Sequence, residues 1–215
     1  MKKHFSWAMM IAIVSLLACS KTNDQGTSAK VPTPVAVDLG LSVKWASFNL
    51  GATTPEAYGD YFAWGEIQTK SSYSFLTYKF GTEPAGPLSK YSSPSTLDLE
   101  DDAAHVLLGG NWRMPTIDEW EELRTHCDWS WNESKSGYTV TGKNGNSIFL
   151  PLAGMRADTS LSQTGESGRY WSSTSFARET KDEPWSAWLE SLYSDDVLED
   201  YGMRSYGFTI RAVTK

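Results

Sequence analysis

Few residues of this chain could act as nucleophiles or metal ligands. Its two cysteines are Cys19 and Cys127, and its three histidines include His126. No Cys-x-x-Cys or His-x-x-x-His spacing occurs, and these are the spacings that recur in zinc sites. His126 and Cys127 are adjacent, and neighbouring helical residues point in different directions, so they are not expected to form a reactive pair. The sequence therefore predicts no metal ion, no cofactor and a buried structural thiol at Cys127.

Carboxylates are the most numerous candidates for acid–base chemistry. They cluster at residues 100–102, 195–196 and 199–200. Acid–base catalysis needs two carboxyl groups held on opposite sides of a scissile bond, and proximity in sequence does not supply that geometry. We expect these acids to form solvated surface, with a calcium site through Asp195, Asp196 and Asp200 as an alternative that lacks EF-hand spacing. The chain is not predicted to be an enzyme.

Aromatic and arginine side chains in the C-terminal third indicate a ligand-binding function. Tyr, Trp and Arg dominate binding hot spots, and aromatic faces also stack on sugar rings. The alternative is that most of these aromatic residues are core, as expected for Trp171 and Trp188 within predicted strands. The residues predicted to bind a ligand from the C-terminal loops are Arg156, Arg169, Trp185, Tyr193, Tyr201 and Arg204.

The charge balance disfavours one class of partner. The chain carries 19 basic and 26 acidic residues, a formal charge of −7. Loss of residues 1–18 would remove Lys2 and Lys3, leaving 17 basic residues and a net charge of 17 − 26 = −9. An acidic domain without a basic stripe releases few counterions from nucleic acid. No nucleic-acid partner is predicted.

The N-terminus has the pattern of an exported lipoprotein. Lys2 and Lys3 precede an apolar run over residues 5–18, which is too short to span a membrane comfortably. Leu16-Leu17-Ala18-Cys19 resembles a bacterial lipobox, which implies cleavage before Cys19 and its acylation; an ordinary signal peptide is the alternative. We expect a signal peptide at 1–18, a flexible tether at 19–35 and a folded domain at 36–215, anchored by lipid to the outer membrane.

A loop followed by a helix start is expected to organise the domain. The pair Gly109-Gly110 ends one helical run, and Pro115 disfavours helix at the residue before it. Thr116 and Glu119 then form a T-x-x-E capping box. We assign Trp112, Pro115, Thr116 and Glu119 to folding. The alternative is that Trp112 and Arg113 form a ligand surface.

Two helices and several short strands are predicted. The helices span 99–108, with acids 100–102 in the first turn, and 117 to about 127. An Asn-Gly pair at 144–145 predicts a hairpin turn, and the alternation of Phe208, Ile210 and Ala212 predicts a half-buried last strand. This pattern favours an α+β fold of short antiparallel strands with two helices. The expected strands are 37–39, 43–46, 61–64, 138–141, 147–150, 168–173, 187–193 and 208–213.

Five motifs in this order resemble the Fibrobacter succinogenes major paralogous (FISUMP) domain: VDLGLSVKWASFNLGA, YGDYFAWGE, WRMPT-x-x-E-W-E-E-L, NSIFLPLAG and YWSST. The resemblance extends from about Val37 to Val213. It implies an α+β domain similar to the C-type lectin-like fold, carried by bacterial exported lipoproteins, and it implies no known activity. Members commonly have a cysteine where this chain has Phe48, so a family disulfide to Cys127 is not carried over.

These features together predict a non-catalytic recognition module. Its ligand would be a glycan or a surface protein, and its contact with the membrane would be through the lipid anchor alone. The surface or periplasmic orientation is left open. The alternative is a structural subunit of the cell envelope or of fimbriae, without a soluble ligand.

Overall fold

The computed structural model describes residues 31–81, 89–91, 93, 95–176 and 186–215. The expected signal peptide, Cys19, most of the tether and Trp185 lie outside the described residues. Within the described part, no helix is long and apolar enough to cross a membrane.

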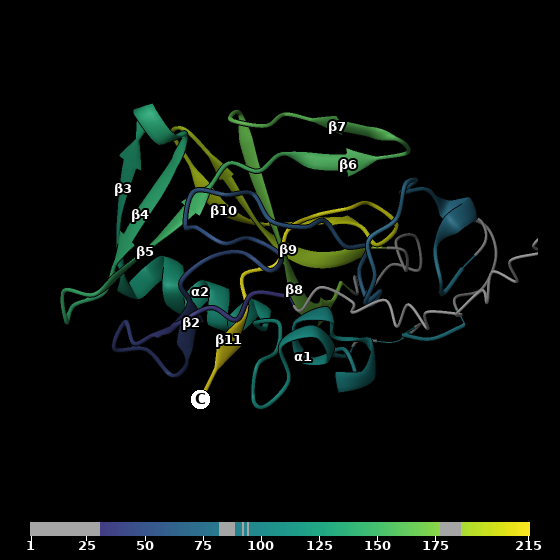
Figure 1. Ribbon diagram of the computed structural model, residues 1–215, viewed down its shortest axis with the longest axis horizontal. Helices are drawn as coiled ribbons and strands as arrows, with labels where there is room; N and C mark the ends of the chain where they lie inside the picture. Colours follow the sequence, from purple (N-terminus) through teal and green to yellow (C-terminus); the bar gives the residue numbers. More distant parts are fainter. Residues whose placement is uncertain (1–30, 82–88, 92, 94, 177–185) are drawn as a thin grey trace, which may run out of the picture. The chain divides into compact units, whose positions relative to one another are not determined.

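The described domain combines two short α-helices with antiparallel strands (Figure 1). Helix α1 spans Ala103–Leu108, and helix α2 spans Ile117–His126. All paired strands are antiparallel, which confirms the predicted α+β class. The 3-10 turns are Phe75–Thr77, Leu99–Asp101 and Glu133–Lys135.

Among the described residues the strands form four small sheets, of which the sheet β10-β9-β8 has the longest strands. The β3-β4-β5 sheet lies to one side of it and the β6–β7 hairpin above it in Figure 1. The strands are β1 (Ala36–Val37), β2 (Lys44–Ala46), β3 (Asp128–Asn132), β4 (Gly137–Thr141), β5 (Ser147–Pro151), β6 (Met155–Ala157), β7 (Ser160–Ser162), β8 (Ser167–Ser175), β9 (Ser186–Tyr193), β10 (Val197–Met203) and β11 (Val213–Thr214).

The predicted Asn-Gly hairpin is confirmed, and two of the expected N-terminal strands also pair. Strands β1 and β2 pair, with Val37 opposite Trp45. Strands β4 and β5 pair around the Asn-Gly turn, with Thr141 opposite Ser147. The sequence did not predict β3, β6, β7 or β10.

Two predicted strands, 61–64 and 208–213, are largely irregular. Phe62 and Phe208 form an isolated bridge instead, with N–H···O distances of 2.9 and 3.1 Å. The expectation of a half-buried segment at 208–213 is also wrong, since Thr209 and Arg211 are as buried as the apolar residues between them. Neighbouring segments cover both faces of this stretch, so alternation carries no information about exposure there.

The predicted first helix begins later than its pattern indicated. Residues 99–101 form a 3-10 turn, and the Asp102 carboxylate caps α1 by accepting from His105 N at 3.0 Å. Asp102 also accepts from Met114 N at 2.8 Å. The expectation that these acids are solvated fails for Asp101 and Asp102, which are 3% and 2% exposed. Burial raises the pKa of Asp102 despite these backbone donors.

Helix α2 begins with the predicted capping box. Thr116 Oγ1 accepts from Glu119 N at 3.3 Å, and Glu119 Oε2 accepts from Thr116 N at 2.9 Å. Arg113 Nη1 and Nη2 donate to the same carboxylate at 2.8 and 2.5 Å. Burial would raise the pKa of Glu119, but the donors from Arg113 and Thr116 lower it overall. The capping carboxylate is thus ionised and held by the loop before the helix.

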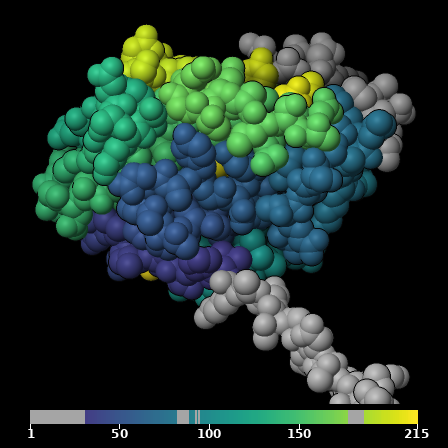
Figure 2. Space-filling model, turned by 45° about the horizontal axis from the view of Figure 1, so that its top comes forward, coloured from purple at the N-terminus to yellow at the C-terminus, as the bar shows by residue number. Residues whose placement is uncertain are grey.

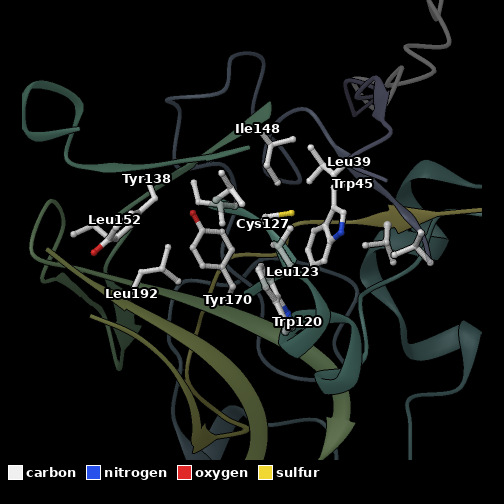
Figure 3. Close-up of a cluster of buried hydrophobic side chains, with 14 residues drawn as sticks. Leu39, Trp45, Trp120, Leu123, Cys127, Tyr138, Ile148, Leu152, Tyr170 and Leu192 are labelled. Carbon is white, nitrogen blue, oxygen red and sulfur yellow. The ribbon is translucent and has the colours of Figure 1, made fainter. Parts of the chain in front are cut away.

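One core cluster lies between α2, the small N-terminal sheet, β8 and the β4–β5 hairpin. Trp120 on α2 contacts Trp45 and Tyr170, with ring centroids 4.6 and 5.6 Å apart respectively. Cys127 lies in the same cluster (Figure 3) and is 9% exposed, as predicted. Burial raises the pKa of its thiol, which disfavours the reactive thiolate. Trp171 is buried in a second cluster, but Trp188 is only half-buried.

Candidate functional site

A pocket of about 320 Å³ lies where β9 and β10 meet the segment 203–208 and β6. Most of its lining is apolar or aromatic, and it is a candidate site for binding. The β6–β7 hairpin, in light green, is at the surface beside yellow atoms of the C-terminal third in Figure 2. The described lining residues are Met155, Arg169, Ser186, Leu189, Asp200, Tyr201, Gly202, Met203, Tyr206 and Phe208.

Strand register builds the floor of this pocket. Leu189 on β9 lies opposite Asp200 on β10, and Gly202 is two residues further along β10. Side chains opposite one another, or two residues apart, share a face of the sheet. A Cβ on Gly202 would lie 2.6 Å from Phe208 Cε2, so glycine permits the close approach of the Phe208 ring. The pocket thus depends on the packing of β10 against residue 208.

Arg169 supplies the positive charge of the pocket. Its Nη1 donates to Gln163 Oε1 at 2.6 Å and contacts Met155 Sδ at 2.9 Å. The guanidinium carbon lies 6.0 Å from the centre of the Phe208 ring. Within the described part of the chain, Arg169 forms no ion pair, and its Nε and Nη2 make no hydrogen bond. Two nitrogens of a half-buried guanidinium therefore remain available to a ligand.

Asp200 is the acidic residue of the lining, and protein donors already occupy its carboxylate. Oδ2 accepts from Ser191 Oγ at 3.0 Å, and Oδ1 accepts from Tyr201 N at 2.8 Å. These two bonds orient the side chain and partly compensate its charge.

Aromatic rings of the C-terminal segment form one wall of the pocket. Tyr206 meets Phe208 nearly at a right angle, with ring centroids 6.3 Å apart. Tyr201 is 39% exposed and stacks on Phe176, with centroids 4.2 Å apart and planes 15° from parallel. Tyr201 alternates with Asp200 and Gly202 along β10, so its ring packs with Phe176 and Trp188 on the face of the sheet away from Leu189.

Of the predicted ligand-binding residues, Arg169 and Tyr201 line the pocket. Both lie on strands, β8 and β10. The sequence predicted the strand at Arg169 but no strand at Tyr201. Arg156 on β6 and Tyr193 at the end of β9 are half-buried and do not belong to the lining. Arg156 lies over the Tyr61 ring at 5.3 Å, and the Tyr193 carbonyl accepts from Tyr138 Oη at 2.6 Å.

Arg204 is a buried structural residue, which corrects its assignment to a ligand surface. It is 2% exposed, and its guanidinium lies 4.5 Å from the centre of the Trp64 ring. Nε donates to Ser186 O and Nη1 donates to Tyr91 O, both at 2.8 Å. Burial lowers the pKa of Arg204 to about 10. The side chain holds separate segments together behind the pocket.

The acidic residues proposed for calcium are not gathered into one site. Asp200 bonds as described above, and Asp196 Oδ1 accepts from Val197 N at 2.9 Å. In the described residues, one group of three acids has oxygens within 4.8 Å of one another: Asp98, Glu100 and Asp101. Lys90 Nζ lies 2.8, 2.9 and 2.6 Å from these carboxylates respectively, so a protein cation already occupies their centre.

The motif assigned to folding lies away from this pocket. Trp112 is half-buried and packs against the second core cluster. It also borders a hollow of about 260 Å³ with His105, Arg113 and Lys215 among its lining. Because Arg113 is paired with Glu119, this hollow offers a weaker polar anchor than Arg169 does.

The sequence did not reveal most of the pocket. Its apolar lining residues, such as Leu189, Met203 and Phe208, are of the same types as ordinary core residues, so the sequence does not distinguish them. One signal could have indicated strand β10: Ser194 and Asp195 separate two strand-like runs, as turn residues do in a hairpin. No pattern within β10 itself indicates that this strand packs against residue 208.

Comparisons of the chain with protein-family models, with curated proteins and with solved structures gave no match. The geometry of the pocket is therefore the main basis for assigning a function. Its lining combines apolar contact area with one available guanidinium, which suits it to binding.

Proposed function

We propose that this protein is an exported, lipid-anchored recognition module that binds a glycan or protein ligand in the Arg169 pocket without catalysing its conversion. The observation that carries this proposal is the pocket itself, whose volume of about 320 Å³ falls at the lower end of known ligand sites. Its aromatic wall and its available guanidinium belong to the residue types that dominate recognition. Its described lining contains no cysteine or histidine.

The FISUMP resemblance supports the rest of the proposal. It leads us to propose a C-type lectin-like arrangement of the domain and a role at the bacterial cell envelope. The lipobox at residues 16–19 supports attachment to the outer membrane through acylated Cys19.

Binding is tested with the full-length lipoprotein in nanodiscs, screened against glycans and cell-surface proteins. We expect a ligand whose affinity falls about tenfold or more when Met155 and Tyr206 of the lining are both replaced by alanine. Tyr193→Ala is the matched control, because Tyr193 is half-buried near the same sheet but outside the pocket lining. Unchanged affinity in the double variant would remove the pocket as the site.

Lipidation has its own test. Intact-mass analysis of the native protein should show loss of residues 1–18 and a lipid adduct on Cys19. A Cys19→Ala variant should leave the membrane fraction. If it stays there as firmly as the native chain, the anchor proposal fails.

A structural envelope subunit is the second candidate, favoured by the outer edge of β10. Among the described residues, no strand pairs with that edge, and unpaired edges can add a strand from a partner. Such a subunit should co-purify with other envelope proteins after membrane solubilisation and should bind no soluble compound in the screen. Recovery as a monomer with a soluble ligand would exclude this candidate.

A further inference from the structure

We infer that the Arg169 pocket binds an apolar carboxylate, a ligand whose aromatic or branched body fills the pocket and whose carboxylate pairs with Arg169. This inference rests on the proposed function and narrows its ligand class. The same chemistry occurs in the C-terminal residue of a polypeptide and in a free aromatic acid, and the experiment below distinguishes these sources.

The apolar body follows from the lining. Met155, Leu189, Met203 and Phe208 supply hydrocarbon and aromatic surface, with Tyr206 beside them. A sugar ring entering the pocket would bring several hydroxyl groups, and each hydroxyl buried without a hydrogen-bond partner weakens binding. Asp200 could satisfy only part of them, because each of its oxygens already accepts one hydrogen bond from a protein donor. The site therefore favours a ligand that requires few hydrogen bonds inside the pocket.

The carboxylate follows from Arg169. A guanidinium binds carboxylates through two parallel hydrogen bonds, a geometry that lysine does not provide. Nε and Nη2 of Arg169 have no described partner, whereas Nη1 is held by Gln163 at 2.6 Å. Gln163 therefore orients the guanidinium and leaves one donor edge available. Two other arginines are committed to acidic partners, since Arg113 pairs with Glu119 and Arg124 donates to Glu190. Arg156 also lacks a described ion pair, but it lies over the Tyr61 ring outside the pocket lining.

The volume limits the size of the body. Ligand sites range from about 300 to 1,000 Å³, and this pocket has about 320 Å³. It thus has room for one large side chain rather than for an oligosaccharide. A terminal phenylalanine, or an acid of similar size, fits this limit.

The test uses the full-length lipoprotein in nanodiscs, with empty nanodiscs as reference, and titration calorimetry. The probes are N-acetylphenylalanine, its amide and N-acetylglycine. We expect the phenylalanine acid to bind about tenfold or more tightly than either of the others, because only it has both the carboxylate and the apolar body. Equal affinity for the acid and its amide would overturn the inference without any variant being needed.

Two variants test whether the carboxylate of the ligand binds to Arg169. Arg169→Met should remove the preference for the acid over the amide while keeping the weak binding of the amide. Arg156→Met is the matched control, since it removes the same charge from a half-buried arginine outside the lining, and it should keep the preference. Loss of the preference in both variants, or in neither, would contradict the assignment to Arg169. Circular dichroism checks that each variant is folded.

A short peptide ending in phenylalanine distinguishes the two sources. Binding about tenfold tighter than that of N-acetylphenylalanine supports a polypeptide terminus, and equal binding supports a free acid. If none of these probes binds while a glycan binds with dependence on Met155 and Tyr206, the inference fails and the proposed function stands. If nothing binds in either screen, the proposed function fails with it.

Discussion

Glu190 lies fully buried on β9, with charged groups on two sides. Arg124 Nη1 on α2 is 3.2 and 3.1 Å from its two oxygens, and Glu199 on β10 is its cross-strand neighbour. Tyr170 on β8 faces it from the other side of the strand. Burial raises the pKa of Glu190 from 4.5 to about 8, although Arg124 opposes the shift. The protonated carboxyl is therefore favoured in the folded domain near neutral pH.

This shift predicts a fall in stability as the pH rises. Between about pH 4.5 and 8 the folded chain holds a proton that the unfolded chain has lost, so unfolding becomes easier with increasing pH. The contribution is fully present below pH 4.5 and is lost by about pH 8, at up to about 1.4 kcal/mol per pH unit. Glu190→Gln should flatten this slope in urea denaturation at pH 5, 6, 7 and 8. Glu133→Gln, at an exposed position on another element, is the control. Parallel curves for wild type and Glu190→Gln would contradict the prediction.

At the scale of elements, the α2 cap is the feature that sequence and structure describe identically. Thr116→Ala removes the hydroxyl that accepts from Glu119 N and should cost about 1 kcal/mol of unfolding free energy. Thr125→Ala, near the exposed end of the same helix, should change it by less than about 0.5 kcal/mol. Urea denaturation measures both. Equal effects would mean that the cap contributes nothing specific.

Two tryptophans next to this cap differ in their burial. Trp120 is completely buried against Trp45 and Tyr170, whereas Trp112 is half-buried. Trp120→Ala should therefore destabilise the domain by about 3–5 kcal/mol, and Trp112→Ala by about half as much. Thermal denaturation compares them. A Trp112→Ala protein that melts like wild type but loses a ligand would instead make the loop a binding surface.

At the scale of the whole molecule, Arg211 joins three distant segments. Its Nε, Nη1 and Nη2 donate to Asn49 Oδ1, Ala46 O and Phe149 O at 2.9, 3.0 and 2.7 Å. The residue is fully buried, and burial lowers its pKa to about 10. The C-terminal segment is thereby tied to β2, to the loop after it and to β5.

Replacing Arg211 should therefore affect the domain as a unit. Arg211→Ala leaves three buried acceptors without a donor, at about 1–3 kcal/mol each, so a loss of at least about 3 kcal/mol is expected. Arg156→Ala, at a half-buried position on β6, should cost much less. A single cooperative transition at lower urea concentration would support this role. An unchanged midpoint would contradict it.

The sequence by itself determined the features whose partners are close along the chain. The capping box joins residues three apart, the Asn-Gly hairpin closes within five residues, and the period of α2 places Trp120 and Leu123 inward. Each depends on backbone conformation and on hydrogen bonds within one or two turns of chain. The burial of Cys127 followed from the same helical pattern, because that position continues the apolar face of α2.

Only the tertiary structure decided which distant residues meet. Arg169, Leu189, Asp200 and Phe208 come from different strands or segments, and their convergence depends on strand register and on the packing of residue 208 over β10. Arginine is a residue type common in recognition sites, yet Arg204 is buried against the Trp64 ring and therefore has a structural role. Local preference fixes the conformation of short segments. The long-range burial of apolar surface selects how those segments pack, and that selection created the pocket.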